Sequence, residues 1–240
     1  MHRRDRPDRS CRDPLRHPPG RHHRRPYRPG IRRGTRTVTD LDLLTTTRAF
    51  RRRLDPAAPI SYRDIQDCLD IAVHAPSGSN RQPWHFVLID DPDLRHAIAD
   101  YYRQGFARNL SGRTPRPDQL HDLASARHLA DHLHTIPLLI LVCTHGRPPA
   151  TAAHLASFYA SIYPTVWNLQ LALHAHGYGT CLTTAHLTHE HDTATLLNIP
   201  YEDITQVALL PVARLHPGTP TPPPRRPATE ATSWNRWSTP

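Results

Sequence analysis

The chain has 240 residues, 30 arginines, no lysine and a net charge of +9. This length suffices for one domain with a sizeable core. Residues 1–36 hold 13 of the arginines against three acidic residues, whereas the remainder of the chain is close to neutral. Because the basic charge is confined to one end, it argues against a nucleic-acid-binding surface on the rest of the chain.

The cysteine spacing and the hydropathy pattern indicate the cellular compartment. The four cysteines are widely spaced without a Cys-x-x-Cys pair, and no apolar run approaches the roughly 20 residues of a membrane span. We therefore expect a cytoplasmic protein with reduced thiols and no membrane partner.

Two regions are expected. Residues 1–36 are too polar and too rich in proline to fold alone, which predicts a disordered basic extension. A basic arm that contacts nucleic acid is the alternative. Residues 37–240 form the folded domain, with a proline-rich C-terminal extension from about residue 217.

The first elements of the domain are two helices and a strand. A helix is predicted over 42–50, and a second begins at Ser61, where Ser61 and Asp64 have the spacing of a capping box. It should end at Ala75, since Pro76 disfavours helical geometry in the residue before it. The apolar run 86–89 predicts a strand.

The later elements mix helices and strands without regular alternation, which indicates an α+β fold. Helices are predicted over 92–108, up to about 134 after an interrupted excursion at 111–117, over 152–176 and over 190–198. Pro164 should bend the third of these. Strands are predicted over 136–143, 180–184 and 206–212, the first buried on both faces.

The segment TTRAFRRR (46–53) is the first candidate site. Arg48 and Arg51 lie three residues apart and would share one face of a helix end, where their planar guanidinium groups could bind a phosphate. A solvated basic face that binds no ligand is the alternative.

The segment APSGSNRQPW (75–84) is the second. Hydroxyl, glycine and amide residues between a helix and a strand offer both donors and acceptors, as the edge of a flavin ring requires. An ordinary connecting loop is the alternative, and only the two segments together favour a flavin site.

In this order and spacing the two segments resemble the FMN-dependent nitroreductases. The resemblance continues through SIYPTVW (161–167), GYGTCLTT (177–184) and PRRP (224–227). It implies a nitroreductase-like α+β sandwich, in which a central mixed sheet is flanked by helices and FMN lies at the interface of a homodimer. The flavin-contacting positions that it implies are Arg48, Ala49, Arg51, Pro76, Ser77, Ser79, Asn80, Gln82, Thr183, Thr184, His186, Leu187 and Arg225.

The roles within this set also follow from the resemblance. Arg48, Arg51 and Arg225 would bind the FMN phosphate, and the 76–82 loop would come from the other subunit. The backbone of 183–187 would face flavin N5, where an N–H donor would stabilise charge on the reduced ring. Many members have serine at the position of Ala49, and some have an acidic residue beside N5 that 183–187 lacks.

The activity implied is oxidoreductase chemistry carried by the cofactor, without a catalytic triad or a metal. NAD(P)H would give hydride to flavin N5, and a small nitroaromatic- or quinone-like acceptor would then take it in a ping-pong mechanism. A flavin-binding storage or sensing protein without turnover is the alternative.

Overall fold

The computed structural model describes residues 40–112, 114–218 and 220–237, and the predicted basic extension lies outside them. The chain divides into two units, 1–34 and 35–240, and the second holds all the elements below. Among the described residues, no helix is both long enough and apolar enough to cross a membrane.

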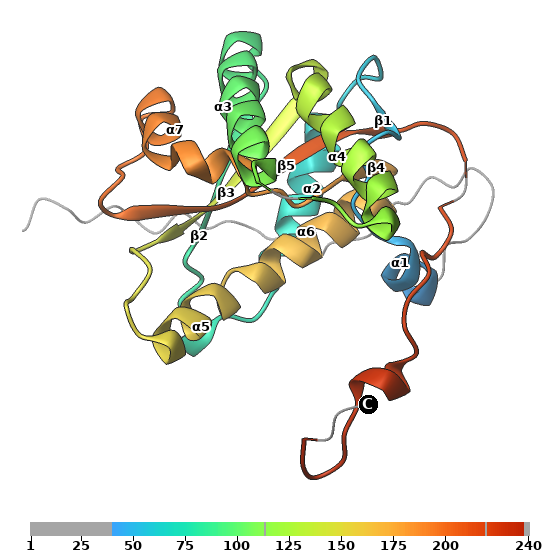
Figure 1. Ribbon diagram of the computed structural model, residues 1–240. Helices are drawn as coiled ribbons and strands as arrows, with labels where there is room; N and C mark the ends of the chain where they lie inside the picture. The colour runs from blue at the N-terminus through green and yellow to red at the C-terminus, as the bar shows by residue number, and fades with distance from the viewer. Residues whose placement is uncertain (1–39, 113, 219, 238–240) are drawn as a thin grey trace, which may run out of the picture. The chain divides into compact units, whose positions relative to one another are not determined.

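A five-stranded sheet forms the centre of the domain (Figure 1). Its strands are β1 (Leu54–Asp55), β2 (Trp84–Ile89), β3 (Leu138–His145), β4 (Tyr178–Thr180) and β5 (Ile204–Leu215). The order is β1-β5-β3-β2, and β4 also pairs with β5. The sequence predicted a mixed sheet, whereas each of these described strand pairs is antiparallel.

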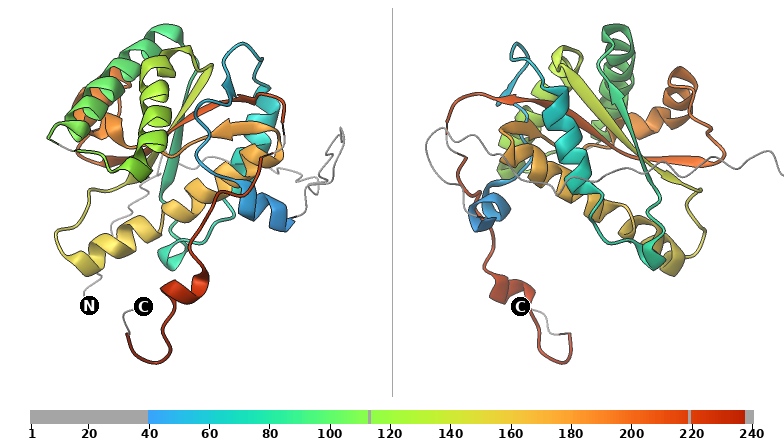
Figure 2. Two further views of the ribbon diagram at one scale, coloured as in Figure 1. Left: turned by 45° about the vertical axis from the view of Figure 1, so that its right-hand side comes forward. Right: turned by 180° about the vertical axis from the view of Figure 1, so that it is seen from behind.

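Helices cover both faces of this sheet (Figure 2). They are α1 (Asp40–Thr46), α2 (Tyr62–Ala72), α3 (Pro92–Leu110), α4 (Leu120–His132), α5 (Ala152–Ala160), α6 (Tyr163–Ala175) and α7 (Glu190–Leu196). Alternate residues of β3 enter two cores: Leu139 and Leu141 pack with α3 and α4, and Ile140 and Val142 pack with α2 and α6. The predicted α+β sandwich is therefore confirmed, and β3 is buried on both faces because each face meets helices.

The start of α2 shows half of the predicted capping box. The Asp64 N–H donates to the Ser61 hydroxyl over 3.2 Å. The return bond is absent, because the Ser61 N–H donates to the Tyr178 hydroxyl instead. The Asp64 carboxylate accepts hydrogen bonds from Tyr178 and Arg214, and thereby ties α2 to β4 and β5.

The single helix predicted over 152–176 is wrong. Pro164 lies in the first turn of α6, and the chain departs from helical geometry at Ile162, between α5 and α6. Proline has no N–H to donate and is best accommodated where the helix does not need one, so it starts a new helix rather than bending an old one. The strand predicted over 180–184 is likewise shorter, since β4 ends at Thr180 and only Thr183 forms an isolated bridge, to Leu209.

Candidate functional site

The arginine segment begins where α1 ends. The hydroxyls of Thr46 and Thr47 donate to the carbonyls of Asp42 and Leu43, one turn earlier in the helix. The predicted helix over 42–50 is thus too long at its C-terminal end. Beyond Thr47 the chain is irregular, and the Phe50 N–H donates to Thr180 O of β4 over 3.0 Å. The Phe50 ring is buried, which fixes the backbone on which the arginines stand.

These arginines surround a cavity of about 470 Å³, called here the arginine cavity. Arg48, Arg51 and Arg225, which the sequence assigned to one phosphate, all line it. Ala49 lines it too, without contributing a hydroxyl. The complete lining is Arg48, Ala49, Phe50, Arg51, Arg52, Arg53, His121, Asp122, Ser125, Pro223 and Arg225.

The charge of the arginine cavity is not balanced by the protein. Five arginines line it and Asp122 is the single acidic residue of the lining, yet none of the five forms an ion pair with a described carboxylate. Like charges held this close repel one another. A dianion such as a phosphate monoester would relieve the repulsion and accept paired hydrogen bonds from the planar groups.

Arg51 links the cavity to the turn that follows β4. Its side chain contacts the buried thiol of Cys181; burial raises the pKa of this thiol to about 11, although Arg51 opposes the shift. The Tyr102 hydroxyl contacts Thr183, and burial raises the pKa of Tyr102 as well. The 183–187 turn therefore begins two residues beyond a direct contact with the cavity wall.

Within that turn the backbone N–H groups of Thr183 and Leu187 are already used, by Leu209 O and Thr184 O. The N–H of Thr184 has no partner among the described residues, and Thr184 is exposed. Thr184 is thus an exposed residue of this turn whose backbone N–H can donate to a ligand.

His186, which the sequence predicted to border the ligand, has a fully buried side chain. It lies in the 3-10 helix η4 (Ala185–His189) and is 0% exposed. Neither ring nitrogen has a hydrogen-bond partner in the described part of the chain. Burial lowers the pKa of His186 to about 3, so the ring is neutral at pH 7. It belongs to the packing beneath the turn.

The second predicted segment forms a strained loop. Ser79, Asn80 and Gln82 have φ values of 53°, 53° and 49°, a region that residues other than glycine adopt at a cost. The Ser77 hydroxyl accepts from the Gln82 N–H over 2.9 Å, and the Gln82 side-chain amide donates to Asn80 Oδ1 over 3.2 Å. The loop is therefore held by its own polar groups.

Ser161 holds this loop against the helices. The Gly78 N–H donates to Ser161 Oγ over 3.1 Å, and Ser161 Oγ donates to Ser157 O. A Cβ at position 78 would lie 3.0 Å from the same oxygen, so the glycine permits the close approach. Beside it is the loop cavity, of about 640 Å³, lined by Arg81, Gln82, Pro83, Thr144, His145, Gly146, Phe158 and Ser161.

The arginine cavity and the loop cavity share no residue. The loop packs against α5, and α1, which leads into the arginine segment, packs against the far end of α6 (Figures 1 and 2). Ser161 and His174, which contact the two segments, are 13 residues apart and so about 20 Å apart at a helical rise of 1.5 Å per residue. One chain therefore brings together the arginines but keeps the 76–82 loop away from them.

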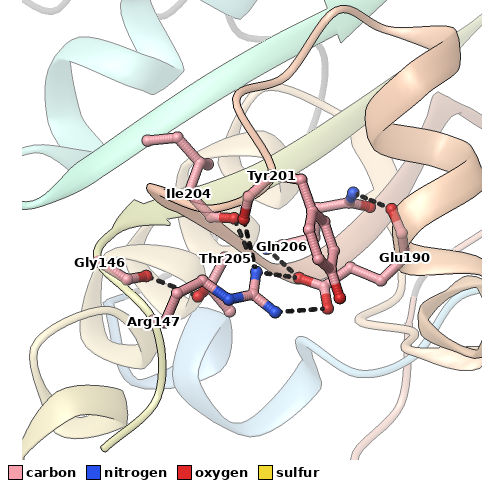
Figure 3. Close-up of polar contacts among 7 residues, drawn as sticks. All are labelled: Gly146, Arg147, Glu190, Tyr201, Ile204, Thr205 and Gln206. Carbon is pink, nitrogen blue, oxygen red and sulfur yellow. Dashed lines mark hydrogen bonds and ion pairs between the residues drawn. The ribbon is translucent and has the colours of Figure 1, made fainter.

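A partly buried polar network lies at the end of the sheet near the loop cavity (Figure 3). Arg147 forms two hydrogen bonds with Glu190, of 3.0 and 3.1 Å, and two more with the carbonyls of Tyr201 and Ile204. Gln206 donates to Glu190 from its backbone and its side chain. Every guanidinium contact is to the protein itself, so we assign this network to the fold. No cluster of metal-ligating residues occurs among the described residues.

Sequence reasoning assigned no role to several residues that line or support these cavities. His121, Asp122 and Ser125 come from α4, whose sequence carries no motif, and their approach to the arginines depends on tertiary packing. Ser161 stood within the SIYPTVW block, but its hydrogen bond to Gly78 spans 83 positions of the chain. Periodicity along a sequence cannot reveal such contacts.

The fold is an α+β sandwich, and five arginines line one of the two cavities. A family model described as the nitroreductase family matches residues 45–214, more than half of the chain. The chain belongs to the nitroreductase family, which confirms the resemblance read from its sequence.

Individual relatives point in two directions. An iodotyrosine deiodinase of Drosophila melanogaster is 29% identical over 126 residues, 50% of this chain and 44% of that protein. A putative NAD(P)H nitroreductase of Bacillus subtilis is 42% identical over 48 residues, 20% of this chain and 23% of that protein. This chain spans less than half the length of the first curated relatives that it matches.

A solved structure supports the fold. A crystal structure of oxidized iodotyrosine deiodinase bound to FMN and 3-iodo-L-tyrosine aligns with a TM-score of 0.63. The alignment covers 82% of this chain and 99% of that one, at 24% sequence identity.

Proposed function

We propose that this protein is an FMN-dependent oxidoreductase that passes hydride from NAD(P)H to a small acceptor. The observation that carries the proposal is the arginine cavity, which five arginines line without an ion pair to any described carboxylate. The chain contains no glycine-rich dinucleotide fingerprint, which favours a mononucleotide over FAD.

The residues present fit FMN. Arg48, Arg51 and Arg225 would hold the phosphate, and the unpaired N–H of Thr184 would donate to the ring. Bound FMN would supply the redox chemistry, accepting hydride in one half-reaction and giving it up in the next. The protein would bind and orient the cofactor, and the N–H of Thr184 would stabilise negative charge near it.

The proposal requires a homodimer. Because the 76–82 loop lies about 20 Å from the arginine segment along α6, a flavin held by the arginines of one subunit would meet the loop of another. Pro76, Ser77, Ser79, Asn80 and Gln82 would then complete the site from the partner subunit. The free, buried thiols of Cys68, Cys143 and Cys181 fit the cytoplasmic location that we propose.

The absorbance spectrum of the purified protein tests this function. We expect a yellow protein that releases FMN on denaturation and is bleached by anaerobic NADPH or NADH, with colour returning when a quinone or nitroaromatic is added. Bleaching without reoxidation by any acceptor would support a storage or sensing protein instead. Colourless protein that FMN cannot reconstitute would exclude both readings.

A second acceptor class follows from the relatives that are named iodotyrosine deiodinases. The Asp122 carboxylate in the arginine cavity could bind the ammonium group of an amino acid. Iodide release from 3-iodo-L-tyrosine by the dithionite-reduced holoprotein, and its loss in Asp122→Asn, would support this acceptor. Oxidation by quinones alone would exclude it.

A further inference from the structure

His174 lies near the C-terminal end of α6 and contacts the arginine segment at two points. Its Nδ1 lies 2.7 Å from the hydroxyl oxygen of Thr47, and its ring centroid lies 5.1 Å from that of Phe50. Thr47 and Phe50 are both buried and stand on either side of Arg48 and Ala49. Arg48 and Ala49, which line the arginine cavity, are therefore flanked by two residues that contact one imidazole.

The other hydrogen bond of Thr47 determines which atom donates in its contact with His174. The Thr47 hydroxyl donates its single proton to Leu43 O over 2.7 Å. In that arrangement His174 Nδ1 carries a proton and donates to the Thr47 oxygen. Burial, and secondarily the positive charge of Arg53, lower the pKa of His174 and favour its neutral ring. Donation from a neutral ring adds no further positive charge beside the arginines.

The remaining anchors of the segment lie on the other side of Phe50. Its N–H donates to Thr180 O, and Arg53 donates to the carbonyls of His216 and Gly218 over 2.9 and 2.7 Å. Arg48 itself forms no hydrogen bond with a described residue. The position of its backbone therefore depends on Thr47 and Phe50, both of which contact His174.

We propose that His174 is a positioning residue for the phosphate site, which acts through Thr47 to place Arg48 at the mouth of the arginine cavity. The inference rests on the proposed function, since it assumes that the cavity binds the FMN phosphate. It adds α6 to the site, because the helix that carries His174 also begins beside the Ser161 that holds the 76–82 loop.

Titration of the apoprotein with FMN, followed by fluorescence quenching, tests the inference. His174→Phe keeps a ring against Phe50 and removes the nitrogen, so FMN binding should weaken about three- to tenfold, the range of one neutral hydrogen bond. His174→Asn keeps a donor near the position of Nδ1 and should bind within about twofold of the wild type. Thr47→Val removes the other partner and should weaken binding as His174→Phe does.

The double variant decides whether the two residues act together. If His174 works through Thr47, His174→Phe with Thr47→Val should bind no more weakly than the weaker single variant. Additive losses, equal losses in His174→Phe and His174→Asn, or wild-type binding by a folded His174→Phe would each overturn the inference. If His174→Phe does not fold, the FMN affinities of Thr47→Val and His174→Asn are compared instead. The inference then requires weaker binding by Thr47→Val than by His174→Asn.

Two controls separate this inference from the function on which it rests. His85→Phe makes the same replacement at an exposed position of β2 and should leave FMN binding unchanged. If wild-type protein does not bind FMN, or Arg48→Ala binds it equally well, the proposed site fails. If Arg48→Ala loses affinity and His174→Phe does not, only the role of His174 fails. Thermal melting of each apoprotein confirms that the variants are folded.

Discussion

Arg48 shows what a single side chain contributes to the arginine cavity. Its guanidinium is partly buried and has no hydrogen-bond partner in the described part of the chain. Arg48→Ala should remove a charge-assisted contact worth about 1.5–3 kcal/mol and weaken FMN binding on the order of 10- to 150-fold. Arg48→Lys should recover only part of the loss, because an ammonium group lacks the planar fork. Titration of the apoprotein with FMN measures both.

Arg226 provides the control for Arg48. It follows Arg225 directly, is exposed and does not line the cavity. Arg226→Ala should therefore leave FMN binding nearly unchanged at moderate salt. Equal losses at Arg48 and Arg226 would mean that general electrostatic attraction, rather than a phosphate site, binds the cofactor. Arg53, which lies in the same segment as Arg48, is a poor control. It donates hydrogen bonds to two backbone carbonyls, so its loss would disturb the fold.

His186 makes the stability of the fold depend on pH. Its pKa is lowered to about 3 by burial, so between that value and the ordinary 6.5 the unfolded chain binds a proton that the folded chain does not. Stability should therefore fall as the pH drops below about 6.5. His186→Leu removes this dependence. The free energy of unfolding of the variant, relative to that of the wild type, should therefore increase by about 2 kcal/mol from pH 7.5 to pH 5. Urea unfolding at the two pH values measures the difference.

A matched replacement isolates that effect. His85→Leu changes an exposed histidine, so its free energy of unfolding should follow the wild-type pH dependence. Parallel pH curves for His186→Leu and the wild type would show that His186 is protonated in the folded chain, and that the neutral buried ring is misassigned.

At the residue scale the sequence predicts some features well and others not at all. Arg48, Arg51 and Arg225 were placed together and do line one cavity, because two of them are neighbours and a family motif links the third. Their contact with the cofactor stays a prediction. His186 was expected beside the ligand but is fully buried, and no property of a single residue reveals which way its side chain turns.

Gly105 shows how two elements are fitted together. It lies in α3, and a Cβ at this position would overlap the carbonyl oxygen of Ala185 in η4. The glycine thus lets α3 approach the turn that carries Thr184. Gly105→Ala would raise helix propensity by about 1 kcal/mol, but the overlap is with backbone and cannot be relieved by a side-chain rotation. We expect net destabilisation of about 1–3 kcal/mol and weaker FMN binding, measured by calorimetry and titration.

The neighbouring Gln104 supplies the comparison for Gly105. It is exposed on the same helix, so Gln104→Ala should leave the melting temperature and FMN binding close to wild type. A melting temperature for Gly105→Ala above that of the wild type would show that helix propensity dominates and that the turn can move away at little cost.

Elements with a strong local signal were predicted, and those shaped by tertiary contacts were not. The apolar run of β3 and the Asp91-capped α3 appear within a few residues of their predicted bounds. The break between α5 and α6 was missed, because a bent helix and two helices share the same apolar pattern. What separates them is the departure from helical geometry at Ile162, with Pro164 in the first turn of the second helix.

The distribution of the site over one chain is the main feature at the scale of the whole molecule. The arginine cavity and the loop cavity share no residue, although the family resemblance gives both segments to one flavin. Motif order along the chain is read easily from the sequence, whereas the separation of the segments depends on where α5 and α6 run. A second copy of the chain reconciles the two observations, and α6 offers a surface for it.

Tyr163 and Trp167 lie one turn apart on α6 and are 38% and 40% exposed, as expected of aromatic side chains that a partner would cover. Trp167→Glu would place an unpaired carboxylate in that interface, at a cost of several kcal/mol. The variant should sediment as a 27.3 kDa monomer and lose FMN, since each site would lack the partner's loop. Leu88→Glu changes a residue of the same 40% exposure on β2 and should remain dimeric and yellow. If Trp167→Glu stays dimeric, α6 is not the interface; if it becomes monomeric and keeps FMN at wild-type affinity, the site is complete within one chain.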